Sequence, residues 1–349
     1  MNAITATRGW EFDRPVPPHG YAWWYVDALS DDGKHGITII AFIGTVFSPW
    51  YAWSRRWGAG DPENHCCMNV ALYGSPRRWA MTDRPRTALR RGPDFLQIGP
   101  SGMEWDGNAL TIQIEEVTAP VPSRLRGTVR VIPQAVSTRS FLLDAAGRHR
   151  WQPIAARSRV EVALESPALR WSGPAYFDTN AGSAPLEQDF VDWDWCRAPM
   201  PDQTAVLYNA LRRDGTAQSL ALRVGADGTV EDMEPPPAAA LPRGFWGVKR
   251  PARSEDGRAR LVRPLEDTPF YTRSEIRTRL LGREATAVHE SLALDRFAAL
   301  PIQLMLPVKV PRAFGYSGLR SDVNAAPLWP IVSRADSRVR TRAPSRDPP

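Results

Sequence analysis

The sequence predicts an all-β protein with two tandem antiparallel barrel or sandwich domains. Asp-Gly pairs, which readily adopt the positive φ angles of tight hairpin turns, recur between strand-like runs. Segments such as LTIQIEEV and SRVEVALES alternate apolar and polar residues, as half-buried antiparallel strands do. Long stretches of helical period are missing, and a length of 349 residues favours about two domains.

The expected strands lie on either side of the Asp-Gly pairs, which occur at 32–33, 106–107, 214–215, 227–228 and 256–257. In chain order the paired runs are YAWWYVDAL and GITIIAFIG, GMEW and NALTIQIEEV, and AVLYNALRR and AQSLALRVG. The segment SEIRTRLLG (274–282) is at most a short helix. Many short strands joined by tight turns indicate a sandwich or barrel.

We expect four parts along the chain: an N-terminal extension (1–18), a first β domain (19–170), a second β domain (171–330) and a disordered basic tail (331–349). The tandem arrangement is inferred from length and turn spacing, because no residue-level repeat is evident. The tail carries several arginines and too little apolar material to fold.

The uncharged run GITIIAFIGTVFSPWYAW (36–53) is long enough to raise the question of a membrane span. It is rich in β-branched residues, is broken by Ser48-Pro49 and follows a turn signal, so a buried strand is favoured. The next segment, PWYAWSRRW, is a candidate for docking on a bilayer face. The first residues lack an apolar signal core, so neither a signal peptide nor a transmembrane helix is predicted.

The net charge of +6 comes almost wholly from arginine. Because no basic helix or RNA-binding signature accompanies it, nucleic acid is not an expected partner, whereas a weak attraction to anionic lipid stays open. The three cysteines, Cys66, Cys67 and Cys196, have no C-x-x-C spacing for a metal and fit a reducing compartment. A glycine-rich phosphate loop, a nucleophile elbow and an H-E-x-x-H motif are also missing.

The segment PAYFDTNAGSAPLEQDFVDWDW (174–195) combines acids with large aromatic side chains. Turn-forming residues surround Asp178, so it is either a residue that caps its own backbone or a carboxyl group used in chemistry. In a strand, Tyr176 shares a face with Asp178. By the same alternation Trp193 and Trp195 share a face, and Asp194 points away from it.

A second candidate pair lies in HRWQP, where His149 precedes Trp151 by two residues, so that both point to one face of a strand. Taken alone, this pattern favours a structural His149. The chain is unusually rich in tryptophan, with 14 residues. Core packing accounts for most of them, and a pocket for a flat, apolar ligand accounts for the rest.

Several of these motifs together resemble the carotenoid 1,2-hydratases, also called hydroxyneurosporene synthases. The resemblance rests on HGYAWWYVDALSDDGKHGITIIAFIGTVFSPWYAW, NHCCMNVALYG, HRWQP and YFDTNAGSAPL followed by FVDWDW. It runs from about His19 to past Trp195 and, more loosely, to about Ala326. It implies a tandem lipocalin-like β-barrel fold and a lyase that needs no cofactor. Such enzymes add water across the terminal C1–C2 double bond of acyclic carotenoids such as neurosporene and lycopene.

The resemblance also implies site residues. The family's functional aspartate corresponds to Asp178, with Tyr176 two positions before it, and its paired histidine and tryptophan fall on His149 and Trp151. Our hypothesis is that Asp178 protonates C2, since burial among aromatic rings can hold a carboxyl group neutral. Trp151 is the candidate for stabilising the resulting cation.

Trp193 or Trp195 would lie behind Trp151 as substrate-binding residues. His149 holds the attacking water or orients the acid, and Tyr176 hydrogen-bonds to the acid or the water. The expected partners are an acyclic carotenoid, water and a membrane surface, with the protein peripheral on the cytoplasmic side of the inner or intracytoplasmic membrane.

Two other functions stay open: a non-catalytic carotenoid or lipid carrier on the same fold, and a related cyclase or Diels-Alderase-like enzyme. The carrier differs from a hydratase in leaving its ligand unchanged. The pairing of His-x-Trp with Tyr-x-Asp favours hydration, because it supplies an acid together with a possible base for water.

Overall fold

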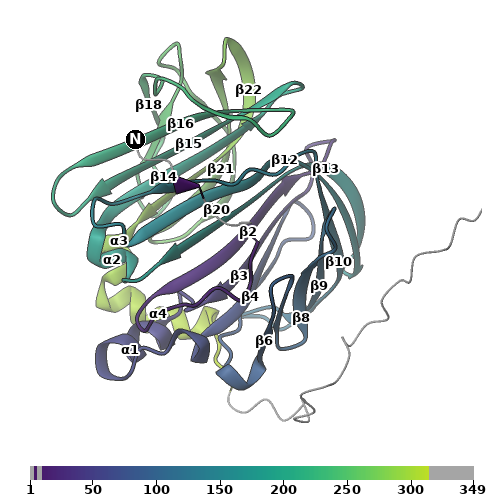
Figure 1. Ribbon diagram of the computed structural model, residues 1–349, viewed down its shortest axis with the longest axis vertical. Helices are drawn as coiled ribbons and strands as arrows, with labels where there is room; N and C mark the ends of the chain where they lie inside the picture. Colours follow the sequence, from purple (N-terminus) through teal and green to yellow (C-terminus); the bar gives the residue numbers. More distant parts are fainter. Residues whose placement is uncertain (1–3, 6–9, 314–349) are drawn as a thin grey trace, which may run out of the picture. The chain divides into compact units, whose positions relative to one another are not determined.

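Two antiparallel sheets and a β ribbon make up the computed structural model, which describes residues 4–5 and 10–313 (Figure 1). The all-β prediction is confirmed. The expected tail (331–349) and the last part of the expected second domain lie outside the described residues.

The first sheet is long and curled (Figure 1). Its main path, in spatial order, runs through β5 (Arg78–Ala80), β4 (Cys66–Tyr73), β3 (Gly36–Ile43), β2 (Tyr21–Leu29), β13 (Ala168–Gly182), β12 (His149–Ser166), β10 (Arg124–Pro133), β9 (Leu110–Val117), β8 (Ser101–Trp105), β7 (Phe95–Ile98) and β6 (Leu89–Arg91). Off this path, β11 (Arg139–Leu142) pairs with β12 and with β1 (Ile4–Thr5).

The second sheet follows later in the chain. Its spatial order is β17 (Val230–Asp232), β16 (Ala217–Gly225), β15 (Gln203–Arg212), β14 (Phe190–Pro199), β22 (Arg283–Ala293), β21 (Tyr271–Leu280) and β20 (Arg260–Asp267). The ribbon joins β18 (Ala238–Leu241) to β19 (Arg250–Arg253). The expected boundary at 170/171 falls at the start of β13, and the chain passes from the first sheet to the second between Gly182 and Phe190.

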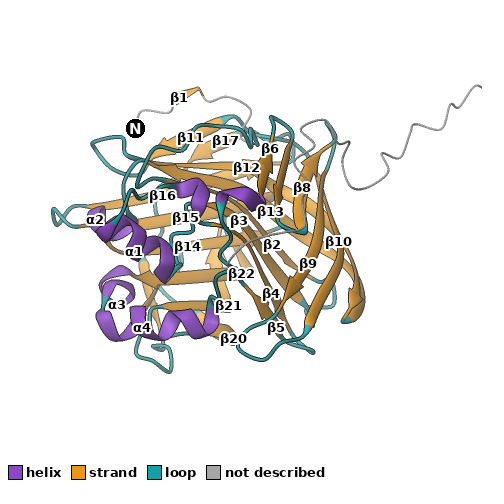
Figure 2. Cartoon of the chain, turned by 90° about the horizontal axis from the view of Figure 1, so that it is seen from below, coloured by secondary structure: helices purple, strands orange, loops and turns teal. Residues whose placement is uncertain are grey.

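The helices gather on one side of the sheets (Figure 2). They are α1 (Pro49–Trp57), α2 (Leu186–Asp189), α3 (Leu294–Ala298) and α4 (Leu300–Lys309), with short 3₁₀ turns at Pro62–Asn64 and Arg86–Ala88. The expectation of at most a short helix over 274–282 is wrong, because most of this segment belongs to β21. Buried Ile276, Thr278 and Leu280 alternate there with exposed arginines, and the polar Thr278 hides this period of two in the sequence.

The Asp-Gly turns are confirmed. Gly33, Gly107, Gly215, Gly228 and Gly257 all have positive φ angles, and each lies between two strands. The buried-strand interpretation of GITIIAFIG is confirmed as well, since β3 covers 36–43 and is almost entirely buried.

The strand β2 is buried on both faces, which explains its continuous apolar sequence. Trp24 and Val26 join the core inside the curled first sheet. Trp23 and Tyr25 point the other way and join a second core between the two sheets. The neighbouring β13 alternates in the same manner, so that Phe177 joins the inner core and Tyr176 the core between the sheets.

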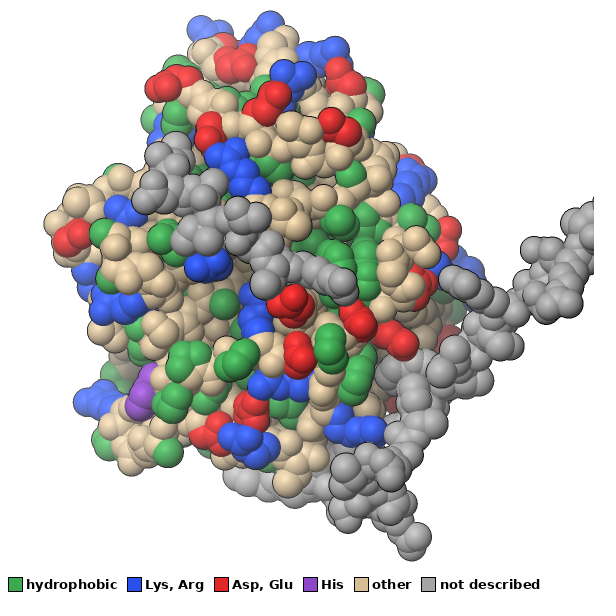
Figure 3. All heavy atoms as spheres, viewed as in Figure 1, with side chains coloured by type: hydrophobic (Ala, Val, Ile, Leu, Met, Phe, Trp, Pro, Cys, Tyr) green, Lys and Arg blue, Asp and Glu red, His purple; other side chains and the backbone are tan. Residues whose placement is uncertain are grey.

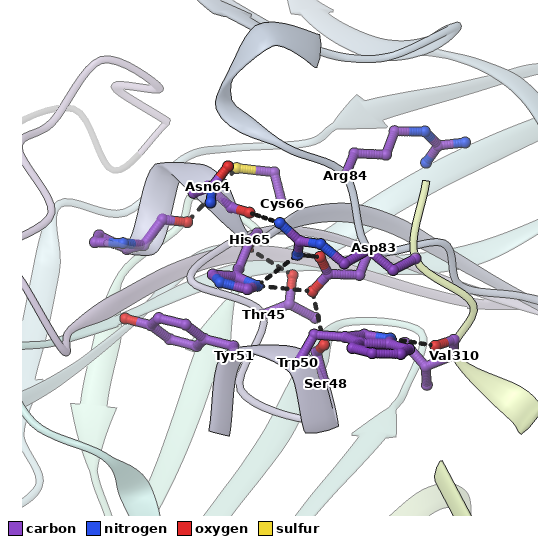
Figure 4. A network of polar contacts seen from close by, with 12 residues as sticks. Thr45, Ser48, Trp50, Tyr51, Asn64, His65, Cys66, Asp83, Arg84 and Val310 are labelled. Carbon is purple, nitrogen blue, oxygen red and sulfur yellow. Dashed lines mark hydrogen bonds and ion pairs between the residues drawn. The ribbon is translucent and has the colours of Figure 1, made fainter. Parts of the chain in front are cut away.

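A polar network around Asp83 fastens the chain after α4 to the first half of the protein (Figure 4). Asp83 is fully buried; it accepts a hydrogen bond from Ser48 Oγ at 2.6 Å and forms an ion pair with Arg312. From α1, Trp50 Nε1 donates to the backbone oxygen of Val310 at 2.8 Å. We call this set the Asp83 clasp; it holds the end of α4 in place.

Charged side chains of both signs are interspersed over the face shown in Figure 3. Many arginines are paired with acids, as Arg159 is with Asp31 and Arg263 with Glu275. On this face the positive net charge therefore does not form a continuous basic patch.

Candidate active site

A cavity of about 510 Å³ lies between the two sheets. The first sheet contributes residues of β2, β3, β4 and β13, the second contributes β14, β15 and β22, and α4 forms part of the wall. The lining is mainly aromatic and aliphatic, with a few polar groups that include Asp178, Asn180, Tyr208 and Glu290. A mostly apolar cavity with a few polar groups is typical of a site for a small apolar molecule.

Asp178 is a buried acid in the wall of this cavity, with 4% of its surface exposed. Its Oδ2 atom accepts two hydrogen bonds, from Trp151 Nε1 at 2.8 Å and from the Tyr176 hydroxyl at 2.8 Å. Its Oδ1 atom is also buried and has no hydrogen-bond partner in the part of the chain that the structure describes. Because Oδ2 is occupied as an acceptor, Oδ1 is the atom on which a proton would reside.

Burial raises the pKa of Asp178 to about 7. The two hydrogen-bond donors stabilise the carboxylate and lower the pKa, but they do not outweigh the loss of hydration. The nearby charge of Glu290 raises the pKa further. A large fraction of Asp178 is therefore protonated at neutral pH, whereas an ordinary aspartate is almost entirely ionised.

Three of the four residues expected to act together meet at one point. Trp151 on β12 and Tyr176 on β13 both contact Asp178 with their polar atoms, as their shared faces suggest. The Trp151 ring lies between Phe141 and Tyr208, at centroid distances of 5.5 and 5.0 Å. Trp151 and Tyr176 are not among the residues that line the cavity, so they lie behind the acid.

His149 lies apart from this point. Its Nδ1 atom is 2.9 Å from the Tyr21 hydroxyl and its Nε2 atom is 2.6 Å from Asp189 Oδ2, so both ring nitrogens are engaged. Burial lowers the pKa of His149 despite the nearby Asp189. His149 is not part of the cavity lining. Its partner Tyr21 stacks on Trp23, and Trp23 lines the cavity. This geometry favours a positioning role over direct contact with water.

Trp193 and Trp195 both line the cavity, whereas Asp194 does not, so the predicted alternation along β14 is confirmed. The Trp195 ring packs against Tyr176 at 5.0 Å and against Tyr25 at 5.5 Å. These rings surround the space beside Asp178 with aromatic surface.

Four further residues line the cavity that the sequence does not predict as site residues: Glu290, Tyr25, Tyr208 and Asn180. One signal was available for Glu290, because it is the one acid in the strand segment TAVHESLAL. Tyr25, Tyr208 and Asn180 have no such signal, since their side chains fit ordinary strand positions.

Among the described residues, no group of three or more His, Cys, Asp or Glu side chains is placed to hold a metal ion. The three cysteines are buried and unpaired by disulfides. Over the same described part of the chain, no helix has both the length and the apolar character needed to span a bilayer.

Fold and cavity together define a lipocalin-like β protein with a mostly apolar cavity beside a buried acid. The fold is similar to that of a crystal structure of an AttH-type protein from Nitrosomonas europaea, with a TM-score of 0.53 at 16% sequence identity, over 78% of this chain and 92% of that chain. At this identity the likeness concerns the fold alone.

The chain belongs to the family of the carotenoid hydratase CrtC, whose family model matches residues 39–318. It is 59% identical to the acyclic carotenoid 1,2-hydratase of Thiocapsa roseopersicina, over 88% of this chain and 77% of that protein. It is 50% identical to the enzyme of the same name from Rubrivivax gelatinosus, over 86% of this chain and 75% of that protein.

Proposed function

We propose that this protein is an acyclic carotenoid 1,2-hydratase that works without a cofactor. The observation that carries the proposal is a buried acid in an apolar cavity: Asp178 is buried, burial raises its pKa to about 7, and its Oδ1 atom has no partner within the described residues. The names of the relatives supply the substrate class. The geometry supplies the acid that hydration of an unactivated alkene requires.

In the proposed mechanism, Asp178 donates its proton to C2 of the terminal double bond. The π electrons form the new C2–H bond, and a tertiary cation remains at C1. Water attacks C1, loses a proton and leaves a tertiary alcohol. The charge left on Asp178 is stabilised at Oδ2 by Trp151 and Tyr176, whose donors are already in place before the reaction.

Aromatic rings stabilise the cation in this scheme. Trp193 and Trp195 face the cavity, and each desolvated ring can contribute up to about 2 kcal/mol toward a cation over its face. We assign this role to them rather than to Trp151, because the Trp151 ring lies behind the acid. His149 acts as a positioning residue through Tyr21 and Trp23.

The substrate reaches this cavity from a membrane in our proposal. An acyclic carotenoid is about as long as the ~30 Å hydrocarbon core of a bilayer, so a cavity of about 510 Å³ holds only one end of it. Three exposed apolar side chains line the cavity, Met305 and Val308 on α4 and Trp246 in the loop before β19. Leu300, Leu304 and Phe245 are exposed on the same two segments, and the six residues together form what we call the apolar rim. We propose that this apolar rim docks peripherally on the cytoplasmic face of the membrane.

The segment PWYAWSRRW, the candidate for this contact in the sequence, forms α1. Its Tyr51 is buried, Trp50 bonds to the end of α4, and Arg55 pairs with Glu187 at 2.7 Å. Trp57 is its most exposed aromatic residue. The apolar rim is therefore the better candidate for bilayer contact.

Incubating the purified protein with lycopene in detergent or vesicles tests the function. We expect a product heavier than lycopene by one water, with a hydroxyl group at C1. A carrier would return lycopene unchanged, and a cyclase or Diels-Alderase-like enzyme would give an isomer of unchanged mass. Either result would overturn the proposal.

A further inference from the structure

A second carboxyl group faces the cavity from the opposite wall. Asp178 lies on β13 of the first sheet, whereas Glu290 lies on β22 of the second sheet, and both line the cavity. Tyr25 is between them: it is the cross-strand neighbour of Asp178, and its hydroxyl donates to Glu290 Oε1 at 2.7 Å. The space beside Tyr25 is therefore bounded by two acids.

The two acids have different surroundings. Asp178 accepts hydrogen bonds from two neutral donors, Trp151 Nε1 and the Tyr176 hydroxyl. Glu290 forms an ion pair with Arg273, and Arg273 also donates to the Tyr25 hydroxyl at 2.7 Å. Glu290 therefore lies beside a cation, whereas the two donors at Asp178 are neutral. One acid is thus suited to give a proton, and the other to accept one, a division of roles seen in other paired-carboxylate sites.

We propose that Glu290 is a catalytic residue that holds the attacking water and accepts its proton. The inference rests on the proposed hydratase function. When Asp178 has protonated C2, the water oxygen bonds to C1, one O–H bond of that water breaks, and the proton moves to Glu290. Glu290 then releases the proton to solvent, and Asp178 takes one up from solvent before the next turnover. The negative charge of Glu290 also stabilises the cation at C1.

A neutral substitution at Glu290 should leave Arg273 paired with another acid. Arg273 forms a second ion pair with Asp27, and Asp27 in turn binds Arg197. The Glu290→Gln variant therefore leaves Arg273 with a buried counter-ion and keeps a side chain of the same shape.

The first experiment compares hydration of lycopene by wild type, Glu290→Gln and Glu275→Gln, each checked for folding by circular dichroism. Glu275 is a matched control, because it is ion-paired with Arg263 and its side chain is 13% exposed, against 12% for Glu290, but it does not line the cavity. We expect kcat of Glu290→Gln to fall about 100-fold or more, the usual effect of losing a positioned base. We expect Glu275→Gln to stay near wild type.

The second experiment restores the missing group from solution. Glu290→Ala leaves space in the cavity, and added formate is a carboxylate small enough to enter that space. We expect formate to raise the rate of this variant about tenfold or more and to leave wild type unchanged. A purely structural role predicts lower stability, an unchanged kcat for the folded protein and no effect of formate.

The outcomes separate the two proposals. If wild type forms no hydrated product, the proposed function is wrong. If wild type forms it and folded Glu290→Gln is equally active, the hydratase function stands and the role of Glu290 is wrong.

Discussion

Asp178 and Asp194 are two buried aspartates whose pKa is raised to about 7 by burial, but only Asp178 lines the cavity. Asp194 instead accepts a hydrogen bond from Asn209 at 2.7 Å on the other face of β14. The raised pKa alone therefore does not identify the acid, and it is the position beside the cavity that does. Asp194 is therefore a matched control for Asp178, because it is a buried carboxyl group that does not line the cavity.

The pH dependence of the reaction follows from the pKa of Asp178. Since the protonated acid is the active form, we expect kcat/KM for lycopene to decline as the pH rises through about 7, and to drop about tenfold per unit well above it. A steady-state profile from pH 5 to pH 9 measures this. The Asp194→Asn variant should show the same profile. A rate that rises with pH across this range would contradict the assignment of Asp178 as the acid.

Replacing Trp151 with phenylalanine removes one donor to the Asp178 carboxylate. This hydrogen bond lowers the pKa of Asp178, so its loss should raise that pKa and move the decline in kcat/KM to higher pH. A hydrogen bond to a charged group contributes about 1.5–3 kcal/mol, so the expected movement is about one to two pH units. Trp171→Phe, on the same sheet but outside the cavity lining, is the control and should leave the profile in place.

The sequence pointed to the cavity-lining Asp178 but not to all the polar residues around the cavity. The contact between Tyr176 and Asp178 could be predicted because the two residues share one face of a strand. The contact between Trp151 and Asp178 could be expected because the family resemblance singled out both positions. Glu290 could not be placed, since it lies 112 positions later and meets Tyr25 only when the two sheets pack. Side chains contributed by different sheets leave no common pattern in the sequence.

At the scale of elements, α4 depends on the Asp83 clasp. Breaking a buried ion pair from one side leaves an uncompensated charge, so Arg312→Ala should lower the free energy of unfolding by about 3 kcal/mol. Urea denaturation measures this change. Arg159→Ala removes an exposed pair with Asp31 and should cost about 1 kcal/mol or less. Equal effects of the two substitutions would mean that the clasp contributes little.

The strands were easier to predict than the helices. Asp-Gly turns and runs such as YAWWYVDAL mark strand ends through local chemistry, and β2 covers that run from 21 to 29. The helix α1 begins with Ser48 and Pro49, residue types that are common at a helix start, but the Ser48 side chain makes no cap hydrogen bond and the first turn holds no acid. The local signal for this helix is therefore incomplete. Contacts with α4 and Glu187 hold it instead.

At the scale of the whole molecule, the cavity arises where two sheets meet, and its rim is apolar. The double variant Leu300→Glu/Leu304→Glu should weaken binding to lipid vesicles about tenfold or more, since burying one leucine side chain contributes about 1.5–3 kcal/mol. Vesicle flotation measures this, and activity on detergent-solubilised lycopene should persist. Val262→Glu, on exposed β20, is the control. Unchanged binding of the double variant would show that the rim does not dock.

The central claim is that Asp178 supplies the proton for hydration, and the most direct test compares Asp178→Asn with Asp194→Asn. Asparagine keeps the shape of the side chain and removes its acid. We predict that the rate of hydrated product formation from lycopene falls about 100- to 10,000-fold in folded Asp178→Asn and stays near wild type in Asp194→Asn. Hydration by Asp178→Asn at the wild-type rate would contradict the account.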